Sequence, residues 1–337
     1  MPQKVRLWKM TMLPGIATID DMEQKYSKLQ KYILATVVYY DGFSYPLTAF
    51  EIWKNLVRTD HSSFEQRMAE VSLAEIFKQL QGEQFSKQIE SIGGFYFLKG
   101  RKGLVEERIR KQKISAGKLK RLSRVVYWLR LVPFIRMVGV TGGLAMKNAH
   151  SQSDWDLLIV IAEGHIWTGR TLLTIFTQLI GKRRYGEKVI NRICLNYFVT
   201  DASLEVITKD LFSANEYMFL IPLFGEDVYR RFQVKNQWIK AMKPSYDLSE
   251  IASLKTLGDG FFSKKIRNVG EFLFSNILVE RFLEKIEKKK ISKNPKTHQE
   301  GSLVYAENDA LIFLPVPHGP VIFEKFKKKM DQLEIEN

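Results

Sequence analysis

Two aspartates, Asp154 and Asp156, stand at the start of an apolar run that continues to Ile161. Residues i and i+2 of a strand point to the same face, so a strand here would present both carboxylates together. Two negative charges that close repel each other unless a cation compensates them. Mg²⁺ prefers carboxylate oxygens and completes its shell with water and phosphate oxygens. The pair therefore predicts a Mg²⁺ site at the start of a buried strand, although an Asp-x-Asp pair alone also suits plain turn chemistry.

A pair of glycines, Gly142 and Gly143, precedes the acids and follows a short β-branched run. Glycine lets the backbone come close to a phosphate, and residues 144–147 could form the first helical turn, whose free N–H groups would face an anion. A glycine pair alone is also an ordinary tight turn. A phosphate-binding turn followed by paired acids is the equipment for metal-assisted phosphoryl or nucleotidyl transfer.

The combined stretch resembles a known signature. Val140-Thr141-Gly142-Gly143, ten further residues and Asp154-Trp155-Asp156-Leu157 are similar to the motif of the nucleotidyltransferase superfamily related to DNA polymerase beta, in particular to bacterial stand-alone nucleotidyltransferase-domain proteins. The resemblance implies that the two glycines contact a triphosphate and that the two aspartates hold the metal ions. Position 143 is more commonly serine in that family, so the hydroxyl contact to phosphate is absent here.

The family usually adds a third carboxylate on a neighbouring strand. The best strand candidate here, residues 193–199, offers only Asn196 as an interior polar residue. An amide oxygen can ligate Mg²⁺ weakly, but it brings no charge and cannot accept a proton. The predicted metal ligands are therefore Asp154, Asp156 and Asn196, with Asp201 and Glu187 as substitutes for the missing acid.

Further polar residues surround the motif. The predicted nucleotide contacts are Gly142, Gly143, Lys147 and Ser153. The run Lys182-Arg183-Arg184 could bind the triphosphate or an acceptor, or it could be solvated. His150 is expected to be a loop residue, and Cys194 a small apolar residue within its strand rather than a nucleophile.

The elements that must position these residues indicate an α+β protein. Residues 136–141, 154–161 and 193–199 are predicted strands, and 166–180 a helix. With the resemblance, this implies a nucleotidyltransferase fold, a small mixed sheet with flanking helices, over residues 116–202. Residues 203–337 are predicted to form a C-terminal helical region, which in this superfamily commonly binds the acceptor.

Residues 25–115 are predicted to form a winged-helix-like domain. Thr48-x-x-Glu51 and Ser72-x-x-Glu75 are capping boxes that open two helices after an apolar helix at 29–40. Gly93-Gly94 lies between two short apolar runs and predicts a hairpin. Three helices followed by a hairpin suit nucleic-acid docking, and they equally suit a helical packing or dimerisation module.

The basic charge is concentrated between residues 99 and 136, which hold thirteen cations against Glu106 and Glu107 and so carry +11 of the net +15. From Lys118 on, the spacing predicts a helix whose apolar residues, such as Leu122 and Val126, face inward while its cations face solvent. Such a basic stripe is either a solvated face or a surface that binds phosphates of nucleic acid.

Composition limits the remaining choices. The 337 residues allow two domains, or one with additions, at roughly 100–200 residues each. A single cysteine excludes an internal disulfide and zinc-ribbon chemistry and fits a reducing compartment. No run approaches the length of a membrane span. We therefore expect a cytoplasmic protein without a membrane partner.

Two functions follow. The first is a Mg²⁺-dependent nucleotidyltransferase that moves NMP from an NTP to a hydroxyl acceptor. The alternative is a catalytically degenerate nucleotide-sensing protein that binds nucleic acid through its winged helix and basic stripe. A third interpretation, without either activity, is a structural module that kept the fold. The intact acid pair favours the first and Asn196 favours the second.

Overall fold

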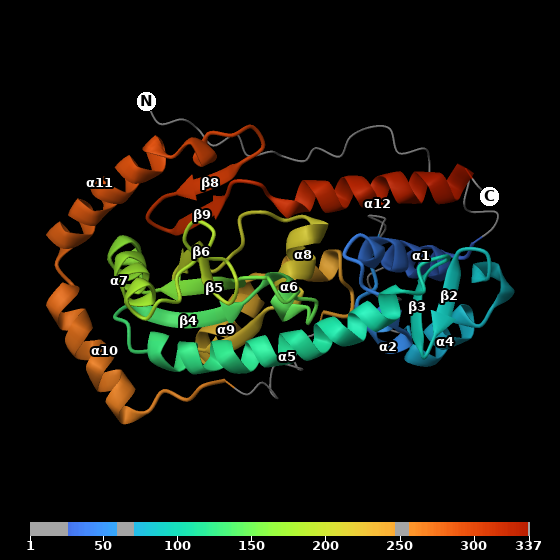
Figure 1. Ribbon diagram of the computed structural model, residues 1–337, viewed down its shortest axis with the longest axis horizontal. Coiled ribbons are helices and arrows are strands. Elements are labelled where there is room, and N and C mark those ends of the chain that lie inside the picture. Colours follow the sequence, from blue (N-terminus) through green and yellow to red (C-terminus); the bar gives the residue numbers. More distant parts are fainter. Residues whose placement is uncertain (1–25, 59–70, 247–255, 336–337) are drawn as a thin grey trace. The chain divides into compact units, whose positions relative to one another are not determined.

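The computed structural model (Figure 1) describes residues 26–58, 71–246 and 256–335, which form two compact units of mixed α and β structure. The smaller unit contains the described residues up to 104, residues 243–245 and those from 322 on. The larger unit contains residues 105–242 and the described residues of 246–321. The expected α+β class is confirmed.

Among the residues that the structure describes, the smaller unit has helices α1, α2 and α4, most of α12 (His318–Ile335), and a three-stranded sheet of order β1-β3-β2. Its elements are α1 (Lys28–Asp41), β1 (Leu47–Thr48), α2 (Ala49–Lys54), α4 (Leu73–Leu80), a 3₁₀ turn (Glu83–Phe85), β2 (Ile89–Ile92) and β3 (Phe95–Leu98). Both predicted capping boxes are present at the starts of α2 and α4. The predicted hairpin is also confirmed, because Gly93 and Gly94 both take positive φ between β2 and β3.

The larger unit is built on a six-stranded sheet of order β7-β4-β5-β6-β9-β8. The strands are β4 (Ile135–Val140), β5 (Trp155–Ile161), β6 (Ile193–Thr200), β7 (Ile221–Phe224), β8 (Leu303–Ala306) and β9 (Ala310–Leu314). All neighbours are antiparallel except β5 and β6, which run parallel. The three predicted strands are confirmed, and three more strands come from residues 203–337, so that region contributes to the same sheet.

Helices cover both faces of the sheet (Figure 1). The helices of the larger unit are α5 (Leu104–Leu129), α6 (Gly142–Ala145), α7 (Ile166–Leu179), α8 (Leu211–Met218), α9 (Glu226–Lys235), a 3₁₀ turn (Gln237–Ala241), α10 (Phe261–Phe274), α11 (Ile277–Lys293) and a second such turn (Pro295–Thr297). One core joins α5 and α7 to the odd-numbered residues of β5, Leu157 and Ile159. The other joins α8 and α9 to Leu158 and Val160. Successive side chains of β5 therefore point to opposite faces of the sheet, and both faces are buried.

Helix α5 departs from the expected orientation of its charges. Its buried face beyond the first turn consists of Arg108, Lys111, Ser115, Lys118, Leu122, Val126 and Leu129. The prediction that Leu122 and Val126 face inward is confirmed. The prediction that every cation from Lys118 on faces solvent is wrong for Lys118 itself, because hydrogen bonds satisfy its ammonium group inside the protein.

Among the residues that the structure describes, no helix combines the length and the apolar character needed to cross a membrane.

Candidate functional site

The two predicted acids meet a third side chain at one end of the parallel strand pair. Asp154 immediately precedes β5, and Asp156 lies within it, opposite Cys194 of β6 in the register of the sheet. One carboxylate oxygen from each aspartate and the sulfur of Cys194 all lie within 4.8 Å of one another. The structure therefore brings together the predicted metal ligands Asp154 and Asp156 and adds a thiol to them.

Arg184 supplies positive charge to this cluster. Its guanidinium donates to Oδ2 of Asp154 at 2.6 Å and to the sulfur of Cys194 at 3.6 Å. Arg184 belongs to the basic run predicted as a triphosphate or acceptor contact, and it follows α7 in the loop that leads to β6. Because its side chain remains partly exposed, it can bind the acids or an incoming anion.

The pKa of Asp156 is raised in this cluster. Burial, and secondly the negative charge of Asp154, raises the pKa of Asp156 to about 7, while Arg184 acts in the opposite direction. A carboxyl with this pKa is only partly ionised at neutral pH. A divalent cation bound to the pair would remove the repulsion and hold both groups ionised.

The glycine turn lies directly against the acids. Gly142 begins α6 with a φ of +63°, and a Cβ built on it would lie 2.9 Å from Oδ2 of Asp156. The N–H of Thr141 also donates to the Asp156 carbonyl oxygen at 3.0 Å. Position 142 therefore requires glycine both for its backbone conformation and for the close approach of Asp156.

Gly143 is under no such restriction. A Cβ there would meet only the Asn148 carbonyl group, with its oxygen at 3.7 Å, which is ordinary van der Waals contact. The serine that is commoner at this position in the family that the motif resembles would therefore fit without displacing the chain.

We expect the two glycines to respond differently to substitution. Gly142→Ala should lower the free energy of unfolding by about 1–2 kcal/mol or more, because alanine is strained at positive φ and its methyl group meets Asp156. Gly143→Ser should stay within about 0.5 kcal/mol of wild type, as an unstrained exposed substitution does. Urea denaturation of both variants tests this, and equal destabilisation by the two changes would contradict the geometry.

A third carboxylate, Glu216 of α8, reaches the same turn and was missed in the sequence. It accepts hydrogen bonds from the Thr141 hydroxyl and the Gly142 N–H. Burial, followed by the charge of Asp156, raises the pKa of Glu216 to about 7. In the sequence, Glu216 is only an acid within a helical pattern, close to apolar residues such as Ala214 and Tyr217 that the structure buries. This pattern gives no information about which strand the helix packs on.

Side chains of α5 form hydrogen bonds with the loop that joins the glycine turn to the acids. Nζ of Lys118 donates to the Ser153 carbonyl oxygen at 2.7 Å and to Oδ1 of Asn191 at 3.0 Å. The hydroxyl of Ser115 accepts from the Ala149 N–H at 3.1 Å. Burial lowers the pKa of Lys118. Lys118 therefore positions the backbone next to Asp154 instead of binding an external phosphate.

The remaining predicted contacts lie in or near this loop. Lys147 is exposed and takes a positive φ of 56°, and Ser153 accepts a hydrogen bond from the His150 N–H through its hydroxyl. Asn196 is half-buried on β6, beside a register shift between β5 and β6. Its role as a ligand, like those of Lys147 and Ser153, stays a prediction.

Asp201 is a predicted substitute for the missing acid, but it lies at the end of the β5–β6 strand pair that is opposite to Asp154 and Asp156. Its N–H donates to the Ile161 carbonyl oxygen, and its carboxylate accepts from the Glu163 N–H at 2.8 Å. The acid pair stands at the beginning of β5 and Ile161 at its end, about 20 Å away for an extended strand. Asp201 therefore cannot share a metal with Asp154 and Asp156.

Comparisons with protein-family models, with curated proteins and with solved structures find no match to this chain.

Proposed function

We propose that the protein is a Mg²⁺-dependent nucleotidyltransferase. The observation that carries the proposal is the contact between the glycine turn and the acid pair, in which a Cβ on Gly142 would lie 2.9 Å from Oδ2 of Asp156. The turn that would bind the phosphates and the carboxylates that would bind the metal are thus adjacent, as the transfer of a nucleotidyl group from a metal-bound triphosphate requires. A nucleotidyltransferase fold for the larger unit and a winged helix for the smaller one are part of this proposal.

The residues take distinct roles in this reaction. Asp154 and Asp156 would hold the metal, with Asn196 as a further ligand, and Gly142 and Gly143 would offer backbone to the phosphates. Bound Mg²⁺ would neutralise the triphosphate and lower the pKa of the acceptor hydroxyl. The hydroxyl oxygen would form a bond to the α-phosphorus, the bond from that phosphorus to the bridging oxygen of the β-phosphate would break, and pyrophosphate would leave.

Two charged residues support this chemistry. Glu216 supplies the third carboxylate that the strand at Asn196 lacks, since it lies near Asp156 and accepts from the Gly142 N–H. With a pKa raised to about 7, it is suited to accept the hydroxyl proton at neutral pH. Arg184, now paired with Asp154, would exchange that partner for a phosphate oxygen.

Transfer itself is tested with the four NTPs, each labelled at the α-phosphate, in the presence of Mg²⁺. Total cellular RNA and total cellular protein serve as acceptors. Wild type should label one of the two acceptor pools, and Asp154→Asn should not. If Asp154→Asn labels the acceptors to the same extent as wild type, the transfer does not use this site.

A nucleic-acid acceptor is favoured by the exposed cations that remain on α5. Lys120, Arg121 and Arg124 are exposed, unlike Lys118. Each phosphate that such a side chain neutralises contributes a slope of about −0.7 to −0.9 to the dependence of log K on log salt.

We expect the variant with Lys120, Arg121 and Arg124 all changed to Gln to flatten the salt dependence of RNA binding by about two units. A matched control changes Lys285, Lys289 and Lys290, exposed cations of α11, to Gln and removes the same charge. Fluorescence anisotropy over a range of salt concentrations measures both slopes. An equal effect of the two variants would show that net charge alone, and no α5 surface, attracts RNA.

A further inference from the structure

Helix α10 is amphipathic in the reverse of the usual sense: Ser263, Arg267 and Glu271 face the protein, and its large apolar side chains face solvent together with its lysines. The residues of α10 that are buried are Ser263 and Arg267, and Glu271 is half-buried beside them. On the opposite side, Phe262 is 79% exposed and Phe272 83%. Ordinary surface helices bury their apolar stripe, so this orientation calls for a partner.

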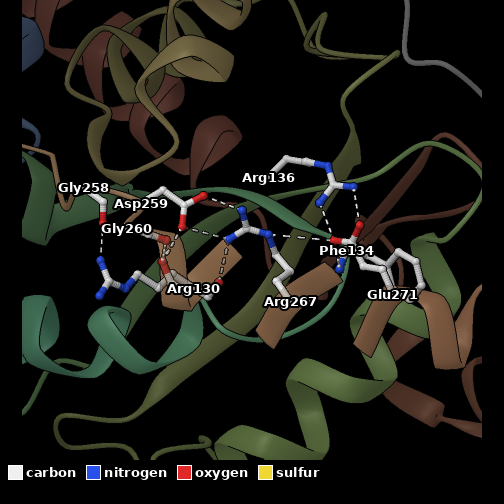
Figure 2. A network of polar contacts seen from close by, with 9 residues as sticks. Arg130, Phe134, Arg136, Gly258, Asp259, Gly260, Arg267 and Glu271 are labelled. Atoms are coloured by element: carbon white, nitrogen blue, oxygen red, sulfur yellow. Dashed lines mark hydrogen bonds and ion pairs between the residues drawn. The ribbon is translucent and has the colours of Figure 1, made fainter. Parts of the chain in front are cut away.

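A polar network fixes the orientation of α10, as Figure 2 shows. Arg267 donates to the Arg130 carbonyl oxygen at 2.9 Å and pairs with Asp259. Glu271 accepts two bonds from Arg136, at 2.6 and 3.0 Å, and one from the Phe134 N–H at 2.9 Å. These bonds hold α10 with its polar side against α5 and β4, so its apolar side cannot turn inward without breaking them.

Helix α11 continues the same arrangement. The buried Glu280 accepts from the backbone N–H groups of Trp167 and Thr168 at 2.8 and 2.9 Å, at the beginning of α7. Glu287, further along α11, pairs with Arg170 of α7. Figure 1 shows α10 and α11 running in succession along the outer side of the larger unit. The polar contacts of both helices face inward, and both helices expose apolar side chains to solvent.

We call this surface the outer face. Its exposed apolar residues are Phe261, Phe262, Ile266, Val269, Phe272, Leu273, Phe274, Ile277, Leu278 and Phe282. The exposed fractions run from 40% for Phe274 to 83% for Phe272. Exposed apolar side chains gathered on two successive helices are typical of an interaction site.

The charges on the outer face have a single sign. Its exposed ionisable residues are Lys264, Lys265, Arg281, Lys285 and Lys289. Every acid between residues 259 and 287 has an inward or lateral partner: Asp259 with Arg267, Glu271 with Arg136, Glu280 with the start of α7, Glu284 with Lys288, and Glu287 with Arg170. The outer face therefore presents apolar and cationic groups without an exposed carboxylate.

We propose that the outer face binds the surface of an anionic lipid bilayer. Phenylalanine and leucine side chains beside lysines are the composition of helices that lie in the headgroup region of a membrane. At helical spacing Lys265 lies among Phe261, Val269 and Phe272, where its long side chain can extend to the headgroups while its stem stays in apolar contact. A second copy of the chain would instead bring cations against cations, with no exposed acid on this face to pair with them.

The exposed side chains of α10 fit the same ligand chemistry. Those of Phe261, Lys264, Lys265, Asn268, Val269 and Phe272 lie close together on the surface of this helix. Two ammonium groups and an amide beside three apolar side chains suit an anionic headgroup together with the first carbons of its acyl chains.

Sedimentation with vesicles tests the proposal. Wild type should sediment with vesicles of phosphatidylcholine that contain about 30 mol% phosphatidylglycerol, and should stay in the supernatant with phosphatidylcholine alone. Changing both Phe262 and Phe272 to Asp should reduce the bound fraction at least tenfold. Changing Lys264 and Lys265 to Gln should weaken binding by roughly tenfold or more.

Two controls separate the outer face from the net positive charge of the protein. Val234→Asp places an acid at a 55% exposed apolar position of α9, and Lys235→Gln with Lys240→Gln removes two exposed charges from the same region. Both should bind vesicles within twofold of wild type, and melting curves confirm that every variant is folded.

Three outcomes would overturn the proposal. Wild type that fails to bind the anionic vesicles excludes a bilayer as the occupant, whether or not the chain then self-associates or captures another protein. Equal losses of vesicle binding in the outer-face and control variants would show that binding depends on net charge alone. Unchanged binding after both phenylalanines become Asp would place the contact elsewhere.

Discussion

Replacing Asp156 by Asn should raise the free energy of unfolding of the metal-free protein by about 4 kcal/mol at pH 8, although the same change should abolish nucleotidyl transfer. The pKa of Asp156 is raised from 3.8 to about 7 by burial and by Asp154, and each tenfold gain in proton affinity on folding corresponds to about 1.4 kcal/mol. Asparagine has nearly the same shape and no charge to desolvate. A residue that lowers stability and is needed for activity is typical of a functional site.

The pH dependence has a definite sign. Because the pKa is higher in the folded state, the folded protein binds the proton more tightly than the unfolded chain does. Stability should therefore fall as the pH rises from about 4 to about 7, and it should level off above that range. Glu216, whose pKa is likewise raised to about 7, adds a fall of the same sign that persists in Asp156→Asn. Urea denaturation at pH 5, 6, 7 and 8 measures both curves.

Asp201→Asn is the matched control, because it makes the same chemical change at the far end of the strand pair. It should leave the pH dependence of stability as in wild type. If Asp156→Asn and Asp201→Asn behave alike, the raised pKa and the proposed metal site both lose their support.

Local patterns predict most elements that position the site. Gly142 and Asp156 were identified from residue type and spacing, because a positive φ and a paired acid at the start of a strand leave direct signatures in sequence. The strands at 135–140, 155–161 and 193–200 follow from their apolar runs, and the capping boxes at Thr48 and Ser72 from their spacing.

The rest depends on contacts between distant segments. Glu216 reaches the glycine turn only because α8 packs on the same face of the sheet as Asp156, and helical periodicity does not specify that packing. Lys118 looks like a solvated cation until its partners, Ser153 and Asn191, are placed beside it. For α10, periodicity identifies two faces but cannot decide which faces the protein, and ion pairs with Arg136 and Asp259 reverse the usual choice.

Binding of an NTP with Mg²⁺ should raise the melting temperature of the wild-type protein. A ligand that binds only the folded state stabilises it by about 2.7 kcal/mol at a concentration of one hundred times Kd. Mg²⁺ should add to this effect, because it removes the repulsion between Asp154 and Asp156 that lowers the stability of the metal-free protein. The gain should therefore be larger at pH 8 than at pH 6.

Thermal melting of wild type and Asp156→Asn at pH 8, with each of the four NTPs and with or without Mg²⁺, tests the central claim most directly. We expect a shift of several degrees with at least one NTP, only when Mg²⁺ is also present and only in wild type. No shift with any NTP at millimolar concentration would contradict the claim that Asp154 and Asp156 form a Mg²⁺–nucleotide site. An equal shift in Asp156→Asn, or one that does not need the metal, would contradict it as well.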